Sequence, residues 1–354
     1  MSYPRIVINL NKLKENATTI LSWAKRNNVS LAYVNKCVNG DKKIASEILP
    51  LGFSFLADSR IENLKSIKTV VPKLLLRIGS IKEANKVVKY ADYSLQSSIE
   101  VIKALDVAAA KLNKVHKIIL MIDLGDLREG ILFSSRELID ETVKEILTLK
   151  NISLEGVGTN LTCYGSIVPT DENLTVLKNI KEHIEETFNI SLPIISGGNS
   201  SSLYLLKEDK LPQGINNLRI GEALLIGTDT STGNKFTELH DDTFILEAEV
   251  VEVYEKPSFP IGKRSVDAFG RVQEYEDKGI MRRAIVAVGR QDIEESIISL
   301  VDKKIELVGA SSDHLIINLK KSKKYKVGSI IKFKVEYGSL LRAFTSKYIS
   351  KIYH

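Results

Sequence analysis

The sequence predicts an α/β protein in which a (β/α)8 TIM-type barrel is followed by a C-terminal, mainly antiparallel β domain. Between residues 6 and 230, short apolar runs alternate with longer segments of helical period. Eight such runs, alternating with helices over about 220 residues, are typical of a (β/α)8 barrel. Beyond residue 240, apolar and polar residues alternate, as in antiparallel strands. We therefore predict a barrel over residues 6–230 and a β domain over residues 240–354, with residues 1–5 as candidates to join the latter.

The barrel elements are predicted in chain order as follows. A helix over residues 10–27 precedes the first strand, and a long amphipathic helix with acidic residues near its start covers residues 170–187. The eight strands are predicted at residues 31–36, 53–57, 74–78, 93–95, 118–123, 154–159, 193–196 and 217–219.

The second domain begins after a linker at residues 228–242, which is rich in Thr, Asp, Gly and Asn. No helix is predicted after this linker. A long irregular loop is marked by prolines and glycines at residues 257–270, and long loops are often functional. Strands are predicted at residues 244–254, 283–288, 304–308, 314–319 and 330–336.

Composition narrows the class of protein. With 44% hydrophobic and 27% charged residues in 354, the chain can bury a full core. Its 50 basic and 44 acidic residues are interspersed without a basic stripe, which does not favour nucleic-acid binding. Two cysteines, no apolar leader and no long apolar span indicate a cytoplasmic protein that does not enter membranes, and the five histidines lack metal-ligand spacing, so no metal site is expected.

Lys36 ends the first apolar run, where an ammonium near a core must find an anion or lose its proton. One interpretation is a lysine whose ammonium reaches solvent at a strand end. The other is a Schiff-base lysine, whose pKa falls when it is desolvated or placed near other cations.

Further polar residues follow other predicted strands, whose carboxyl ends form one rim in a barrel. Strand five leads to Arg128, strand six to Asn160, and strand eight contains Arg219. Strand seven is followed by small residues suited to an anion, Ser196-Gly197-Gly198-Asn199-Ser200-Ser201-Ser202. Alternatively, Ser200 and Ser201 cap a helix and Arg128 forms a structural ion pair with Asp123.

Taken together, Lys36, the Asp-x-Gly-x-x-Arg pattern at residues 123–128, Asn199-Ser200 and Arg219-x-Gly221 resemble the alanine racemase family of fold-type III pyridoxal phosphate enzymes. The resemblance is nearly end to end, since that family also joins its barrel to a β domain. Residues 121–125, 158–165, 196–200 and 310–314 most resemble the branch that includes ornithine racemase.

The resemblance implies a homodimeric isomerase with pyridoxal 5'-phosphate that interconverts L- and D-ornithine by two-base proton transfer at Cα, with the active site shared between subunits. Lys36 would hold the cofactor and act as one base. The alternatives are an alanine or broad-spectrum basic amino-acid racemase, or a cofactor-binding protein without catalysis. By the same resemblance, cofactor contacts come from Asn160, Asn199, Ser200, Arg219 and Gly221, and substrate contacts from Arg128, Ser311, Ser312 and Asp313.

The sequence also departs from the family pattern. Gly40 stands where many members have a phosphate-binding tyrosine, and residues 289–292 replace an entrance tyrosine with charged residues. The stretch expected to supply the second base has no tyrosine. Asp267 is our first choice there, with a turn aspartate as the competing interpretation. Cys163, Tyr164, Tyr275 and His314 remain alternatives for the base, and carboxylates that could receive a cationic side chain are Asp126, Glu129, Glu222, Asp267 and Asp292.

Overall fold

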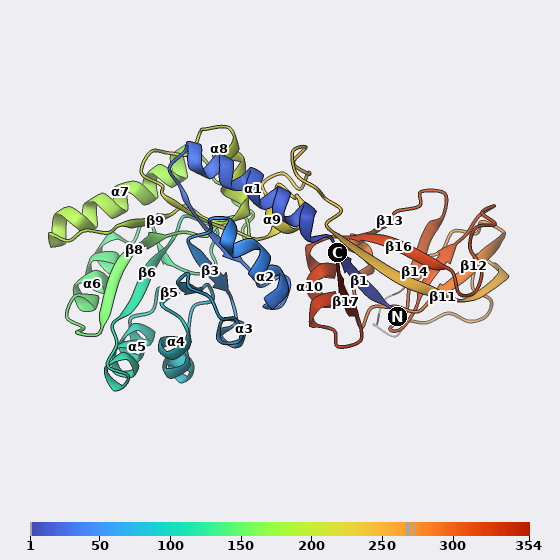
Figure 1. Cartoon of the computed structure of the whole chain (residues 1–354), viewed down its shortest axis with the longest axis horizontal. Coiled ribbons are helices and arrows are strands. Elements are labelled where there is room, and N and C mark those ends of the chain that lie inside the picture. The colour runs from blue at the N-terminus through green and yellow to red at the C-terminus, as the bar shows by residue number, and fades with distance from the viewer. Residues whose placement is uncertain (1, 267–269, 271, 273) are drawn as a thin grey trace. The chain divides into compact units, whose positions relative to one another are not determined.

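A computed structural model describes all residues of the chain except 1, 267–269, 271 and 273. The chain divides into two compact units, whose elements are labelled in Figure 1. One unit is Lys12–Asp241, and the other combines Met1–Asn11 with Asp242–His354. The N-terminal strand β1 (Arg5–Ile8) therefore belongs to the same unit as the C-terminal part of the chain.

The first unit is a closed parallel barrel, as predicted. Its strands pair in the order β5-β4-β3-β2-β10-β9-β8-β6, and a pairing between β5 and β6 closes the ring. The two-residue strand β7 (Ile131–Leu132) adds to β6 outside the ring. All eight predicted strands are present: β2 (Ser30–Val34), β3 (Phe55–Asp58), β4 (Lys73–Leu75), β5 (Tyr93–Gln96), β6 (His116–Asp123), β8 (Ile152–Gly158), β9 (Ile194–Ser196) and β10 (Asn217–Ile220).

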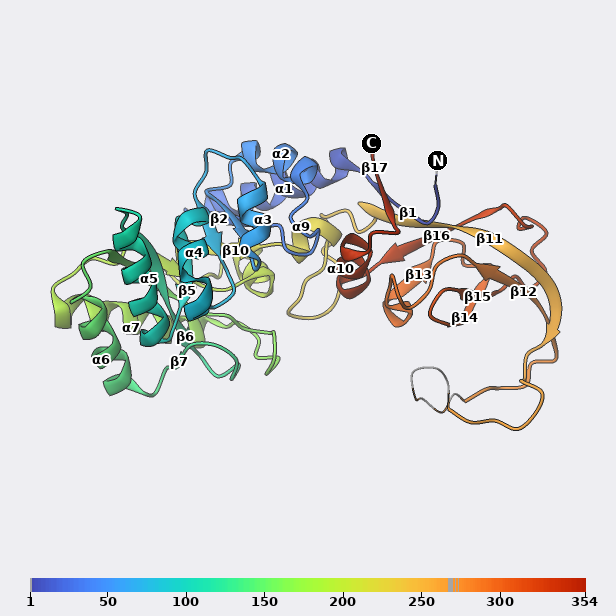
Figure 2. The ribbon, with the colours of Figure 1, turned by 90° about the horizontal axis from the view of Figure 1, so that it is seen from below.

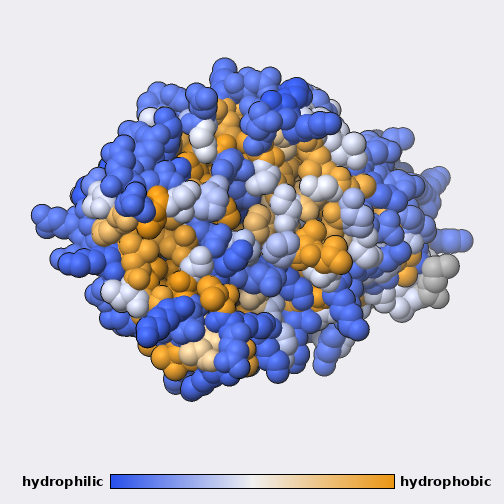
Figure 3. All heavy atoms as spheres, turned by 60° about the vertical axis from the view of Figure 1, so that its left-hand side comes forward, coloured by the Kyte–Doolittle hydropathy of each residue, from blue (hydrophilic) through white to orange (hydrophobic). Residues whose placement is uncertain are grey.

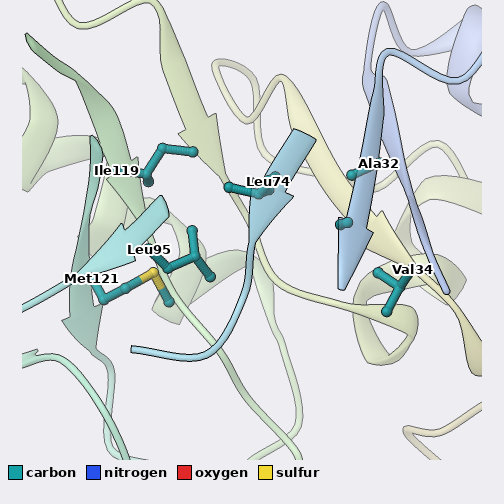
Figure 4. Close-up of a cluster of buried hydrophobic side chains, with 7 residues drawn as sticks. Ala32, Val34, Leu74, Leu95, Ile119 and Met121 are labelled. Carbon is teal, nitrogen blue, oxygen red and sulfur yellow. The ribbon is translucent and has the colours of Figure 1, made fainter. Parts of the chain in front are cut away.

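Apolar side chains that point inward from alternate strand positions fill the barrel. Ala32 and Val34 on β2, with Leu95 on β5 and Ile119 and Met121 on β6, belong to one buried cluster (Figure 4). Every second residue of a strand faces the same side, which is why these positions alternate along β2 and β6. This packed core supports the strand ends above it.

Helices follow the strands and cover the outside of the barrel. In α1, the apolar residues Leu13, Ala17, Ile20 and Trp23 recur at helical spacing and are buried, so one stripe packs inward. The helices are α1 (Leu10–Arg26), α2 (Lys42–Ile48), α3 (Ile61–Ser66), α4 (Ala84–Tyr90), α5 (Ile99–Lys111), α6 (Arg136–Ile146), α7 (Asp171–Phe188), α8 (Leu203–Lys207) and α9 (Glu222–Ile226).

The long predicted helix is present as α7, and its ends have clear causes. Thr170 forms a capping box with Asn173, in which each side chain accepts a hydrogen bond from the other residue's backbone N–H. Asn189 closes the helix in the left-handed conformation.

The second unit is a mainly antiparallel sheet in the order β13-β16-β11-β12-β15-β14. Its longest strand, β11 (Phe244–Pro257), curves along the sheet in Figure 2 and has a bulge between Val250 and Glu252. β1 pairs with β11 antiparallel and with the C-terminal strand in parallel. The other strands are β12 (Ile280–Val286), β13 (Ile298–Leu300), β14 (Glu306–Ala310), β15 (Leu315–Asn318), β16 (Ile330–Val335) and β17 (Ser350–Tyr353).

The prediction that no helix follows the linker is wrong. Helix α10 (Tyr337–Thr345) packs through Ser339, Leu340, Ala343 and Phe344, which are buried. Their spacing of three and four residues is that of a helix face. The short length of α10 obscured this period in a region of alternating strands.

Hydrophobic and hydrophilic residues are interspersed on the face drawn in Figure 3. Within the part of the chain that the structure describes, no helix combines the length and apolar character needed to cross a membrane.

Candidate active site

Lys36 lies in the turn that follows β2, at the carboxyl end of the barrel. The strand stops at Val34, two residues earlier than predicted. Asn35 N–H still donates to the carbonyl of Ala57, at 2.8 Å, and so extends the pairing with β3. Val34, the last residue of the strand, belongs to the buried cluster inside the barrel, and Lys36 follows two residues later. The lysine is half-buried at the rim where barrel active sites form.

Arg219 on β10 is a buried, fixed cation in the same end of the barrel. Only 3% of the residue is exposed. Its guanidinium donates to Ser196 Oγ at 2.6 Å and to the Thr159 carbonyl at 2.7 Å. Ser196 in turn donates to Asn217 Oδ1 at 2.6 Å. Burial lowers the pKa of Arg219 to about 10, and the charge of Glu129 opposes this by raising the pKa. The guanidinium therefore remains protonated at neutral pH.

The segment after β9 presents backbone and hydroxyl groups that suit an anion. Asn199 is the cap here, since its Oδ1 accepts from Ser201 N–H at 2.8 Å. Ser200 Oγ accepts instead from the backbone N–H groups of Gly221, at 3.3 Å, and Ala223, at 3.4 Å. The buried Ser201 hydroxyl has no hydrogen-bond partner among the residues described. An unpaired buried hydroxyl is costly and is expected where a further group binds.

The loop after β6 is shaped by Asp123. Its Oδ1 accepts from the N–H groups of Gly125, at 2.8 Å, and Leu127, at 3.1 Å. Arg128 pairs with its neighbour Glu129, with Nη2 to Oε1 at 2.7 Å and a close contact between Nε and Oε2. Arg128 is therefore in an ion pair, as the competing interpretation has it, but with Glu129 rather than Asp123.

Asn160 connects this loop to the segment after β9. Its Nδ2 donates to Glu129 Oε1 at 3.2 Å and lies 3.4 Å from Cys163 Sγ. Its Oδ1 accepts from Asn199 Nδ2 at 2.8 Å. The structure thus gathers the predicted residues Arg128, Asn160 and Asn199 into one hydrogen-bonded group.

Asp126, a candidate for binding a cationic side chain, holds a loop instead. It is 1% exposed, and its carboxylate accepts from Tyr164 N–H at 2.9 Å. Gly165 N–H donates to the Asp126 carbonyl at 3.0 Å, and a Cβ at Gly165 would lie 2.8 Å from that oxygen. Asp126 and Gly165 therefore hold the loop that carries Cys163 close to the loop after β6.

Asp58 at the end of β3 was not singled out from the sequence. Burial raises its pKa to about 6. The N–H of Arg60, the Asn63 amide and the charge of Lys36 act in the opposite direction and lower this pKa. Asn63 Nδ2 contacts both Asp58 oxygens, at 3.1 and 3.2 Å. A Cβ at Gly40, whose φ is +71°, would lie 2.6 Å from Asn63 Cγ, so Asn63 fills the space beside this glycine. The signal was present, since Asp58 ends an apolar run just as Asp123 does.

In the second unit, two predicted segments lie together. Arg290 N–H donates to the Ser311 carbonyl at 2.9 Å, and Gln291 N–H to the Ser312 carbonyl at 3.0 Å. Gly289 allows this approach, because a Cβ there would lie 2.4 Å from the Ser312 carbonyl oxygen. Beside it, Ser312 Oγ donates to Asp313 Oδ2 at 2.8 Å. Ser311, Ser312 and Asp313 therefore form one loop with residues 289–292.

The second-base candidates have different surroundings. Asp267, our first choice, lies outside the described residues. Tyr164 is 74% exposed, and Tyr275 is 41% exposed and packs on Phe259. His314 N–H donates to Ser311 Oγ at 3.1 Å. Cys163 lies in the Asn160 and Asn199 group. Among the residues placed by the structure, no cluster of metal-ligating side chains is found.

Comparison with known proteins shows the family of this chain. The family model "Alanine racemase, N-terminal domain" matches residues 8–229. The chain belongs to the alanine racemase family. It is 48% identical to the ornithine racemase of Acetoanaerobium sticklandii over 351 residues, covering 99% of each protein. It is 40% identical to the lysine racemase of Thermotoga maritima over 356 residues, covering 100% of this chain and 99% of that protein.

Solved structures of the family share the fold. The alanine racemase of Clostridium difficile 630 matches with a TM-score of 0.76 and 17% identity, covering 100% of this chain and 96% of that one. The Bartonella henselae alanine racemase, described with covalently bound pyridoxal phosphate, matches with a TM-score of 0.75 and 18% identity over 100% of both chains. These likenesses confirm the predicted barrel and β domain.

Proposed function

We propose that this protein is a pyridoxal phosphate-dependent racemase that interconverts L- and D-ornithine. The observation that carries the proposal is the 48% identity to an ornithine racemase along 99% of both chains. The 40% identity to a lysine racemase favours lysine as the second candidate substrate. Both substrates are amino acids with a cationic side chain.

The residues at the carboxyl end of the barrel fit the cofactor. The unpartnered Ser201 hydroxyl and the Ser200 O–H suit a phosphate group, with the Gly221 N–H beside them at Ser200 Oγ and Asn199 holding the turn. Arg219 presents only N–H donors, so it would bind the ring nitrogen without giving up a proton. Pyridoxal phosphate, when bound, supplies an aldehyde that condenses with amines and a ring that acidifies the substrate Cα.

The chain's own groups would then handle binding and proton transfer. The Lys36 amine would hold the cofactor through its aldehyde and, as a free amine, would accept or return the proton on one face of Cα. Arg128 would bind the substrate carboxylate through the guanidinium N–H groups that Glu129 does not engage. Asn160 contacts the cofactor from the end of β8.

The proton on the opposite face needs a second carrier. Asp267, outside the described residues, remains our candidate, and Ser311, Ser312 and Asp313 are proposed to meet the substrate carboxylate. We propose that these groups act from the partner subunit of a homodimer. In support, Leu127 and Tyr164 on the two loops beside the site are 66% and 74% exposed, as expected of apolar groups that a partner covers. Cys37 and Cys163, both in the described part of the chain, form no disulfide, which fits the proposed cytoplasmic location.

The test is a substrate comparison. Purified protein saturated with pyridoxal phosphate is incubated with L-ornithine, L-lysine, L-arginine or L-alanine, and chiral chromatography follows the D-isomer. We expect the highest kcat/KM for ornithine, lysine next and alanine lowest. Alanine turning over fastest would contradict the assignment to a basic substrate, and no turnover of any of the four would contradict a racemase.

A further inference from the structure

Glu129 lies at the centre of the charged groups in the barrel mouth. Both of its carboxylate oxygens are engaged: Oε1 accepts from Arg128 Nη2 at 2.7 Å and from Asn160 Nδ2 at 3.2 Å, and Oε2 contacts Arg128 Nε. Its side chain is 20% exposed, against 43% for Arg128. The carboxylate is thus the more enclosed partner of this pair.

The charge of Glu129 also acts on the second arginine of the site. It is the first of the groups that keep the pKa of Arg219 from falling further on burial. Two guanidinium groups and Lys36 share this end of the barrel, and like charges that close together repel one another. One carboxylate near both arginines reduces that repulsion.

The donors and acceptors of the hydrogen bonds around Glu129 can be assigned in only one consistent way. Asn199 Nδ2 donates to Asn160 Oδ1 at 2.8 Å, so Asn160 must turn its Nδ2 towards an acceptor. Glu129 Oε1 is that acceptor. The loops after β6, β8 and β9 are therefore tied together through one carboxylate.

We propose that Glu129 is a positioning residue, which holds the Arg128 guanidinium and the Asn160 amide in the orientation that the cofactor and the substrate carboxylate require. We assign it this role rather than that of a receptor for the distal ammonium of the substrate, because the contacts of its carboxylate described above are directed to Arg128 and Asn160. This inference rests on the proposed racemase function.

The experiment compares Glu129→Gln with Glu155→Gln. Glutamine keeps an acceptor for Asn160 but loses the charge and places an NH2 group against Arg128. Glu155 is a matched control: its side chain on β8 is 18% exposed and contacts Ser153 Oγ, at 2.7 Å, rather than any candidate site residue. Three quantities are measured: kcat/KM on L-ornithine, kcat/KM on L-norvaline, which has the same carbon chain without the distal amine, and the affinity of the apoprotein for pyridoxal phosphate by absorbance titration.

For Glu129→Gln we expect kcat/KM to fall at least about tenfold, and by a similar factor on both substrates, since misplacing a binding group by a fraction of an ångström has effects of this order. Cofactor affinity should fall as well, while Glu155→Gln resembles wild type. A loss confined to ornithine would overturn the proposal in favour of a substrate-ammonium receptor, and unchanged kinetics and affinity would overturn it outright. If wild type turns over neither substrate, the proposed function fails, whereas the affinity titration still tests Glu129.

Discussion

The two ends of the barrel both contain buried polar side chains, but these side chains differ in their charge state. At the carboxyl end, Arg219 stays charged although it is 3% exposed, and Arg128 and Glu129 pair beside it. At the amino end, the His116 imidazole bonds to Ser94 Oγ at 2.9 Å, and burial lowers its pKa to about 4, so it is neutral. Buried charge is costly, and perturbed charged groups gather at functional sites, so Arg219 with the Arg128–Glu129 pair supports the proposed site at the carboxyl end.

A cavity of 460 Å³ also lies at the amino end, with a lining that includes Pro72, Lys73, Asp92, His116 and Lys117. Lys73 Nζ there donates to the Leu64 carbonyl at 2.7 Å, and Lys117 Nζ donates to Tyr93 Oη at 3.1 Å and lies 4.0 Å from Glu155 Oε1. In barrels of this type the amino end contributes stability and the carboxyl end carries the active site. Volume alone therefore does not locate the site.

The largest expected effect at the carboxyl end is that of Lys36→Arg. Arginine keeps a positive charge and a long side chain, but it neither condenses with an aldehyde nor exchanges a proton near neutral pH. We expect racemisation to fall by at least about 10³-fold, the scale of a lost acid–base group. The visible absorption band of the bound cofactor should disappear as well. Lys42→Arg, at an exposed position of α2, is the control and should behave as wild type.

Arg219→Lys should have the next largest effect. A lysine has no planar fork, so it cannot donate to Ser196 Oγ and to the Thr159 carbonyl with the same geometry. We expect kcat to fall about 10²-fold, with a smaller change in KM. Arg26→Lys, on the surface of α1, provides the comparison. Equal kinetics in the two variants would show that the fork of Arg219 is not needed.

The two ends should also differ in the sign of their pH effects on stability, measured by urea unfolding of the apoprotein. Burial raises the pKa of Asp58 to about 6 from 3.8, so the folded state binds the proton more tightly. Relative to Asp58→Asn, wild type should lose up to about 3 kcal/mol as pH rises from 4 to 7. A difference that stays flat over this range would contradict the raised pKa.

His116 should show the opposite trend and the smallest effect on activity. Its pKa falls to about 4 from 6.5, so the unfolded state binds the proton more tightly. Relative to His116→Gln, wild type should lose up to about 3 kcal/mol as pH falls from 7 to 4. Racemase activity at neutral pH should not change. A large loss of activity in His116→Gln would break the distinction between the two ends.

The barrel was predictable because each strand is an apolar run bounded by polar residues. The site residues Asn160, Asn199 and Arg219 were predictable because they follow or end such runs. Pairings between loops were not predictable. That Arg128 pairs with Glu129 rather than Asp123 depends on Asp123 being engaged by two N–H groups of its own loop. Asp58 ends an apolar run in the same way, but its contact with Asn63 beside Gly40 exists only in the folded chain.

In the second unit, the alternation of apolar and polar residues led to the wrong prediction that no helix is present. Helix α10 is only nine residues long, and it lies between β16 and β17 in a region whose other segments alternate. The strands that pair with β1 could not be predicted from nearness in the sequence, since its partners β11 and β17 begin at Phe244 and Ser350. Pairing over such separations is decided by tertiary structure rather than by local sequence.

The most direct test of the central claim, that the carboxyl end of the barrel is a racemase site built on Lys36, is proton exchange at the substrate Cα. Wild type and Lys36→Ala, each with excess pyridoxal phosphate, are incubated with L-ornithine in D2O, and deuterium at Cα and the D-isomer are followed together. We predict that wild type produces deuterated D-ornithine and that Lys36→Ala produces neither deuterium incorporation nor D-isomer above background. Racemisation by Lys36→Ala at the wild-type rate would contradict the account.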